Sequence, residues 1–303
     1  MFSRNEHAFL VNFKCWFFLS LSQMQTMDNL LTIQYKEKVF TLKELMEDNN
    51  QFSKVLKFPK KRPHGSMALV YDKGYAIADH KLDHLEKLIS SGRFALTQAH
   101  RKLHKSPIEW SSGYVGQLWL RANYLNNAIV WYNSMIDYIL QAVWFAFDFY
   151  SPITNAEDYE KELKKYLWPT ISEIYKKHTT NENFTLLYQR LLSYKSNTSV
   201  KTVNNWANTL KHKGTINYQE LHVDRGIEII FKDKFTYSTL DKDRVDLDYA
   251  CEVLKDVHIE LVGITNFLID FMDVEGFLNK DENGVYHPKT RSKSEYKKFW
   301  MND

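Results

Sequence analysis

The side chains best suited to chemistry in this sequence lie in one short segment, SVKTVNNWANTLKHKG, at residues 199–214. Successive residues of an α-helix are rotated by about 100°, so four polar positions of the segment share one face within about 60°. These positions are Lys201, Asn205, Asn208 and His212. The apolar positions lie on the opposite face: Val200, Val203, Ala207 and Leu210. We therefore predict an amphipathic helix that packs through its apolar face and presents amides, a histidine and a lysine.

The polar face combines groups that serve ribonuclease chemistry. The imidazole of His212 can move protons at a ribose hydroxyl or a leaving oxygen, because imidazole titrates near neutral pH. Lys211 and Lys213 flank it, and cations with nearby amides stabilise charge that develops on a phosphate. The competing interpretation is structural: a histidine in the last helical turn complements the helix dipole, and the lysines are solvated. Both interpretations stay open on this segment alone.

A helix that ends in Asn208-Thr209-Leu210-Lys211-His212-Lys213-Gly214 resembles the signature helix of the HEPN superfamily. Its position between a long aromatic helix and a final apolar helix strengthens the resemblance, which covers roughly residues 115–275. The resemblance implies a helical bundle that is commonly dimeric. Many such domains are metal-independent endoribonucleases of toxin–antitoxin, phage-defence and CRISPR-associated systems. Their motif is an arginine, a polar residue and a histidine, and two copies of it meet across the dimer in one cleft.

The resemblance assigns roles to individual residues. His212 takes the place of the motif histidine, and Asn208 takes that of the polar residue after the arginine. The arginine position falls on Ala207, which cannot bind a phosphate, or with a longer spacing on Asn205, which is uncharged. A lysine of the same helix would have to supply the missing cation, without the fork geometry of arginine. The candidate substrate-binding residues are Asn205, Lys201, Lys211 and Lys213. We therefore expect weak or absent catalysis.

The main element that must position this face is a long helix, predicted from about residue 115 to Tyr150, where Ser151-Pro152 ends it. Its segment 128–150 is long enough to cross a bilayer, but polar residues interrupt it, and an Asp at a bilayer centre costs about 2.5–3.5 kcal/mol. The polar positions share an arc of about 80°: Asn123, Asn126, Asn133, Asp137, Gln141 and Asp148. In one interpretation this polar stripe is exposed to solvent or forms hydrogen bonds inside a helical bundle. In the other it lines a cleft shared with another helix. In the second case Asn126, Asn133 and Asp137 would support the site.

Shorter patterns place the remaining elements. Residues 32–40 alternate as a short strand or hairpin does, and Thr41 with Glu44 forms a capping-box pattern that opens a helix through about Leu56. Residues 75–104 are expected to form one long helix or two short ones, and further helices are expected at about 155–178, 181–194, 199–213 and 245–277. Pro169 is expected to kink the helix at 155–178. Gly214 is expected to end the helix at 199–213. Three β-like runs at about 215–240 predict a small hairpin or sheet between the last two helices.

Together these patterns predict a mainly α fold, a HEPN-like helical bundle with a small β insertion. The expected layout is a poorly ordered extension at 1–26, an N-terminal helical region with a short β element at 27–114, the bundle at 115–278 and a polar tail at 279–303. The apolar run from Phe9 to Leu21 faintly resembles a signal peptide, but Lys14 interrupts it. We therefore expect a cytoplasmic protein that does not enter a membrane.

Composition narrows the function classes further. The net charge of +3 does not mark the whole chain as a polyanion binder, although a local basic patch stays open. Cys15 and Cys251 give no zinc or redox spacing, and neither a cofactor nor a metal is expected. His80 and His84 would share a helix face as two metal ligands do, but no third ligand is evident, which favours a solvated pair. His258 is expected at a surface or bundle edge.

Two functional hypotheses follow. The first is a HEPN-like homodimer that associates with RNA, as an endoribonuclease or its degenerate relative, with an antitoxin-like protein partner. The second is a non-catalytic helical module that binds another protein.

Overall fold

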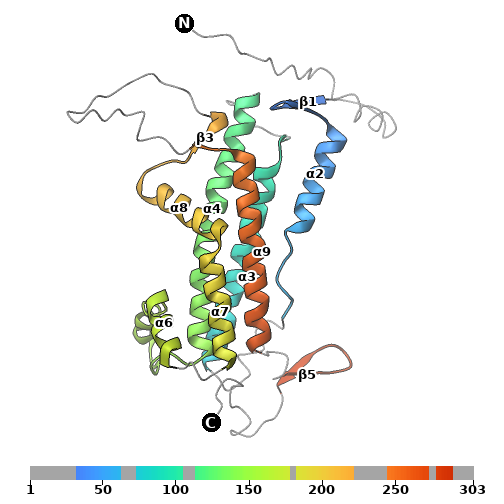
Figure 1. Ribbon diagram of the computed structural model, residues 1–303. Coiled ribbons are helices and arrows are strands. Elements are labelled where there is room, and N and C mark those ends of the chain that lie inside the picture. Colours follow the sequence, from blue (N-terminus) through green and yellow to red (C-terminus); the bar gives the residue numbers. More distant parts are fainter. Residues whose placement is uncertain are drawn as a thin grey trace, which may run out of the picture. The chain divides into compact units, whose positions relative to one another are not determined.

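The computed structural model of the chain describes residues 32–62, 73–104, 113–177, 182–221, 244–272 and 278–288 (Figure 1). Within these ranges the protein is mainly helical, which confirms the predicted fold class. The helices are α2 (Leu42–Val55), α3 (Lys73–His100), α4 (Tyr114–Ala146), α5 (Ala156–Glu162), α6 (Trp168–Lys177), α7 (Glu182–Ser196), α8 (Thr198–His212) and α9 (Leu247–Met272). The strands are β1 (Thr32–Tyr35), β2 (Lys38–Thr41), β3 (Asn217–Tyr218), β4 (Arg244–Val245), β5 (Leu278–Lys280) and β6 (Tyr286–Pro288).

The chain divides into two compact units. Unit 1 comprises residues 1–56, 94–127 and 214–252, and unit 2 comprises residues 57–93, 128–213 and 253–303. Helices α3, α4 and α9 each contribute residues to both units.

Unit 1 begins with the predicted hairpin. Strands β1 and β2 pair antiparallel, with Thr32 opposite Thr41, and the alternation buries Ile33 and Tyr35 on one face. The predicted capping box is present, because Thr41 N donates to Glu44 Oε2 over 2.7 Å and Glu44 N donates to Thr41 Oγ1 over 3.2 Å. Helix α2 therefore starts directly at the end of β2 and buries Leu45 against the unit. Strands β3 and β4 add a short parallel pair.

Unit 2 is a helical bundle in which parts of α3, α4, α7 and α9 run side by side (Figure 1). Close approach of α3 to α4 is possible because Gly92 has no side chain, and a Cβ there would lie 2.9 Å from Met135 Cε. Helix α7 is tied to α9 by the ion pair between Arg190 and Glu260, at 3.2 Å. The core is formed by buried aliphatic and aromatic side chains such as Ile139 and Phe145.

The structure differs from the sequence expectations at several element ends. Helix α4 stops at Ala146, before the predicted end at Tyr150, and Asp148 follows with φ of 55°. The helix expected at 155–178 is two helices, α5 and α6, because Pro169 lies in the first turn of α6, where its missing N–H costs no hydrogen bond. The tail expected at 279–303 begins with the antiparallel pair β5 and β6.

Some expectations fall partly or wholly outside the described residues. The extension at 1–26 does so completely, and of the insertion at about 215–240 only residues up to 221 are described. In the part of the chain that the structure describes, no helix is long and apolar enough to span a membrane.

Candidate functional site

Helix α8 carries the predicted polar face, and local interactions fix both of its ends. The side chain of Asn197 accepts hydrogen bonds from the backbone N–H groups of Ser199 and Val200, at 2.8 and 3.2 Å. Asn197 thus caps α8 and is the one residue between α7 and α8, which the sequence placed at 181–194 and 199–213 with four residues between them. At the other end Gly214 has φ of 111°, as expected for a glycine that follows a helix.

The two faces of α8 are as the helical spacing predicted. Val203 and Ala207 are buried, at 2% and 0% exposure. The polar side chains on the other side are exposed: Lys201, Asn205, Asn208 and His212. None of these four side chains makes a hydrogen bond to another residue within the described ranges. Lys211 and Lys213 are exposed as well, so the face is open to a ligand from solvent.

Ala207, where the resemblance to HEPN domains leads us to expect an arginine, is fully buried. A guanidinium at this position would have to be buried without a partner, or α8 would have to rotate away from its packing. The neighbouring positions on the exposed face carry amides. The helix therefore presents an imidazole and lysines but no forked cation beside His212.

The three residues expected to support the site from α4 do not form one group. Asn126 belongs to unit 1, where its Oδ1 accepts a hydrogen bond of 2.8 Å from the hydroxyl of Tyr218. Asn133 belongs to unit 2 and lines a pocket together with Lys201 of α8. Asp137 belongs to the same unit, where burial raises the pKa of its carboxyl and the charge of Lys211 on α8 partly offsets this rise. The structure thus brings Asn133 and Asp137 to the side of α8 and places Asn126 in a different cluster.

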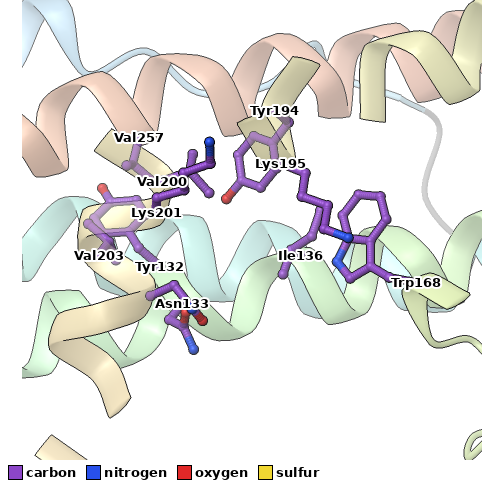
Figure 2. A pocket seen from close by; sticks show the side chains of 11 residues that line it. Tyr132, Asn133, Ile136, Trp168, Tyr194, Lys195, Val200, Lys201, Val203 and Val257 are labelled. Carbon is purple, nitrogen blue, oxygen red and sulfur yellow. The ribbon is translucent and has the colours of Figure 1, made fainter. Parts of the chain in front are cut away.

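The pocket has a volume of about 320 Å³ and lies in unit 2 (Figure 2). It is lined by residues from five helices: Tyr132, Asn133 and Ile136 of α4, Trp168 of α6, Tyr194 and Lys195 of α7, Val200, Lys201, Val203 and Asn204 of α8, and Val257 of α9. Its size is at the lower end of the range for small-molecule sites, so it would hold a compact group rather than an extended ligand.

The charge of the pocket comes from two lysines. Lys195 extends over the indole of Trp168, with its Nζ 4.8 Å from the ring centroid (Figure 2). Lys201 lines the pocket from the exposed face of α8. Burial raises the pKa of the Tyr132 and Tyr194 hydroxyls, so both phenols stay neutral at physiological pH. Among the described residues no carboxylate lines the pocket, so it favours a group with an apolar or aromatic body and a negative charge.

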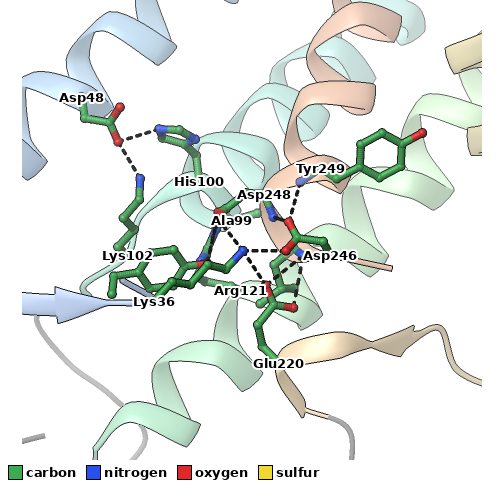
Figure 3. Close-up of polar contacts among 12 residues, drawn as sticks. Lys36, Asp48, Ala99, His100, Lys102, Arg121, Glu220, Asp246, Asp248 and Tyr249 are labelled. Carbon is green, nitrogen blue, oxygen red and sulfur yellow. Dashed lines mark hydrogen bonds and ion pairs between the residues drawn. The ribbon is translucent and has the colours of Figure 1, made fainter. Parts of the chain in front are cut away.

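Unit 1 contains a polar cluster that the sequence did not reveal (Figure 3). Arg121 of α4 is fully buried. Its Nη2 lies 2.6 Å from Asp248 Oδ1, its Nε donates to the carbonyl of Ala99 over 2.7 Å, and its Nη1 lies 2.5 Å from the hydroxyl of Tyr35. The arginine is thereby held by protein groups from three other segments of the chain, which indicates a structural role for the cluster.

Lys36 extends the same cluster from the β1–β2 turn (Figure 3). Its Nζ lies within 3.0 Å of three carboxylates, those of Glu220, Asp246 and Asp248. Lys36 has φ of 54°, a left-handed backbone conformation within the turn. Together the two cations neutralise most of the three negative charges, which leaves little excess charge for an external ligand.

Histidines elsewhere differ from their expected settings. His258 is buried rather than at a bundle edge. Its Nε2 donates to the carbonyl of Lys57 over 2.7 Å, and its Nδ1 accepts from the hydroxyl of Tyr132 over 2.8 Å. A neutral imidazole satisfies both contacts, because one nitrogen donates and the other accepts. His80 and His84 do share a face of α3, as the spacing predicted, and their Nε2 atoms lie 3.1 Å apart.

Within the described residues, no group of three or more histidine, cysteine, aspartate or glutamate side chains is arranged to hold a metal ion. Comparison of the chain with protein-family models, with curated proteins and with solved structures gave no match.

Proposed function

We propose that the exposed face of α8 and the pocket beside it bind single-stranded RNA, and that the protein does not cleave it efficiently. The observation that carries the proposal is the local charge. Residues 183–213, which include nearly all of α7 and all of α8, contain no Asp or Glu. The cations in this stretch are Arg190, Lys195, Lys201, Lys211 and Lys213. A backbone of phosphates is the polyanion that such a surface attracts.

The arrangement of these cations supports a nucleic acid over a small anion. Arg190 is paired with Glu260, whereas the four lysines are exposed. Lys201 borders the pocket, and Lys211 lies nearly three helical turns further along α8. Charges spread over such a length fit successive phosphates better than a single one.

The pocket supplies the second part of a single-strand site. Unpaired bases stack on aromatic side chains, and each such contact is worth about 1–3 kcal/mol. Trp168 offers an indole beside Lys195, and Asn133 and Asn204 add amides that can pair with the edge of a base. A duplex would not present a base in this way, so the geometry favours a single strand.

Catalysis is expected to be weak for a specific reason. His212 is exposed and has an imidazole that can move a proton. The forked cation of the HEPN motif is absent because Ala207 faces the core. A lysine can attract a phosphate electrostatically, but it does not hold two of its oxygens in a fixed geometry. We therefore propose binding as the function, with His212 as a contact to the strand.

Fluorescence anisotropy with a labelled single-stranded RNA tests the proposal, and the same samples are checked for cleavage on a denaturing gel. We expect binding that weakens steeply with salt, no turnover, and the same cleavage background for His212→Ala. Trp168→Leu should weaken binding, whereas Trp119→Leu, a substitution in unit 1, should not. Absence of binding at low salt would refute the proposal.

A further inference from the structure

We infer that His80 and His84 form a two-imidazole site for a divalent late first-row metal ion, such as Cu²⁺, Ni²⁺ or Zn²⁺. The site lies on α3 in unit 2, and its residues are separate from the α8 face and from the pocket. The inference stands independently of RNA binding.

The separation of the two nitrogens carries the inference. His80 Nε2 and His84 Nε2 lie 3.1 Å apart. Metal–imidazole bonds are roughly 2.0–2.1 Å long, so two nitrogens at this separation subtend an angle of about 100° at a shared ion. That angle lies between the values of octahedral and tetrahedral coordination. Both geometries are within reach of the side chains without a change in the helix.

The backbone holds this geometry in place. Residues four apart lie one above the other on an α-helix, and both histidines are inside the continuous α3. The ring of His84 is stacked on Tyr138, with centroids 5.9 Å apart and planes inclined by 21°. One ligand is thus oriented by packing, while the exposed His80 is free to adjust. A rigid donor beside an adjustable one reduces the entropy lost when an ion binds.

The protonation state of the pair suits a metal ion. Without an ion, the two Nε2 atoms share one proton, because a neutral imidazole has one donor and one acceptor nitrogen. When an ion binds, the donor imidazole exchanges its proton with solvent and changes to the tautomer with the proton on Nδ1, so both rings stay neutral and both Nε2 atoms offer a lone pair. Imidazole is a preferred ligand of these late transition metals.

The remaining coordination positions are filled by water. His80 is exposed and His84 half-buried, so solvent reaches the ion. No third histidine, cysteine or carboxylate joins the pair among the described residues. The site is therefore an open one, in contrast to the closed four-ligand sites that stabilise folds.

Titration of the untagged full-length chain with Cu²⁺ alone tests the inference, because Cu²⁺ stands highest in the affinity order of these ions. Calorimetry measures affinity, and electron paramagnetic resonance counts coordinated nitrogens. We expect one tight equivalent per chain with two imidazole nitrogens. His80→Ala should lower the affinity by at least about tenfold, since loss of a ligand costs at least as much as loss of an outer-shell partner. His84→Ala should have the same effect.

The controls separate this site from other histidines and from unfolding. His212→Ala removes an exposed histidine of α8 and should leave the tight equivalent unchanged. His80 is exposed, so its substitution should leave the circular dichroism spectrum and the melting temperature intact. Equal Cu²⁺ affinity in the double variant His80→Ala/His84→Ala and the wild type would overturn the inference. A single coordinated nitrogen in the wild type would also overturn it.

Discussion

Arg121 Nη2 and Asp248 Oδ1 lie 2.6 Å apart in unit 1, although 127 positions separate the two residues in the sequence. The arginine is completely buried, whereas the aspartate side chain keeps 39% exposure. The aspartate thus lies at the edge of the unit and supplies the negative charge that makes burial of the arginine tolerable. Tyr35 and Lys36 bind the same carboxylate and join the hairpin to it.

Asp248→Asn should destabilise the protein, because Arg121 would lose its charged partner while it stays buried. We expect a loss of about 1–3 kcal/mol in the free energy of unfolding, less than for a fully buried pair because water reaches Asp248. Urea unfolding followed by circular dichroism measures it. Glu47→Gln, on the exposed surface of α2, is the matched control and should change the value by less than about 0.5 kcal/mol.

Asp248 also predicts how the free energy of unfolding depends on pH. Burial alone would raise the pKa of Asp248, but the charge and hydrogen bonds of Arg121 and Lys36 outweigh it and lower the pKa to about 2. The unfolded carboxyl titrates near 3.9, so the unfolded chain takes up the proton first as pH falls. The stabilisation is therefore complete above about pH 4 and declines toward pH 2. The difference between wild type and Asp248→Asn should shrink over this window, and a constant difference would contradict the assignment.

The imidazoles of His258 and His104 should remain neutral at pH values well below the usual pKa of histidine. Burial lowers the pKa of each to about 4, and for His258 the hydrogen bond to the Lys57 carbonyl opposes this only in part. Unfolding exposes both rings to water, where they titrate near 6.5, so stability declines as pH falls from about 6.5 to 4. Nitrogen-15 NMR titration of the imidazoles should give midpoints below pH 5. A midpoint above 6 for either ring would show that it is not buried in this way.

Substitution by alanine should affect stability differently at two glycines of unit 2. A Cβ on Gly74 would lie 2.5 Å from the backbone oxygen of Phe145, which cannot move aside. A Cβ on Gly263 would lie 2.9 Å from Nη2 of Arg190, the end of a flexible side chain. Gly74→Ala should cost about 1–3 kcal/mol by overpacking, whereas Gly263→Ala should be neutral or gain up to about 1 kcal/mol from helix propensity. Thermal unfolding of the two variants in parallel tests the contrast.

Local features of this fold were predictable from the sequence. The capping box of Thr41 and Glu44 and the two faces of α8 depend on residues within a few positions of one another. Helical periodicity and cap chemistry report such short-range order directly. The sequence does not predict the break between α5 and α6, because Pro169 is compatible with a kink inside one helix as well as with the first turn of a new helix.

The long-range features were not predictable in the same way. The pocket requires Trp168 of α6, Tyr194 of α7 and Asn133 of α4 to meet, and nothing in their local sequences links them. The polar cluster around Arg121 likewise joins segments more than eighty residues apart. The sequence offers one signal for this cluster, because Arg121 is a charged residue among the apolar positions of α4. An arginine that is buried there, as the structure shows, needs an acidic partner.

The salt dependence of RNA binding by Lys201→Ala/Lys211→Ala tests the central claim most directly. Each phosphate contact on a single strand contributes about 0.7 to the slope of log K against log salt, so loss of two should lower the slope by about 1.4 and the affinity at low salt by at least about tenfold. The control Lys43→Ala/Lys164→Ala removes two exposed lysines from α2 and from the segment after α5, and it should behave as the wild type does. Equal slopes for the two double variants would contradict RNA binding by the α8 face.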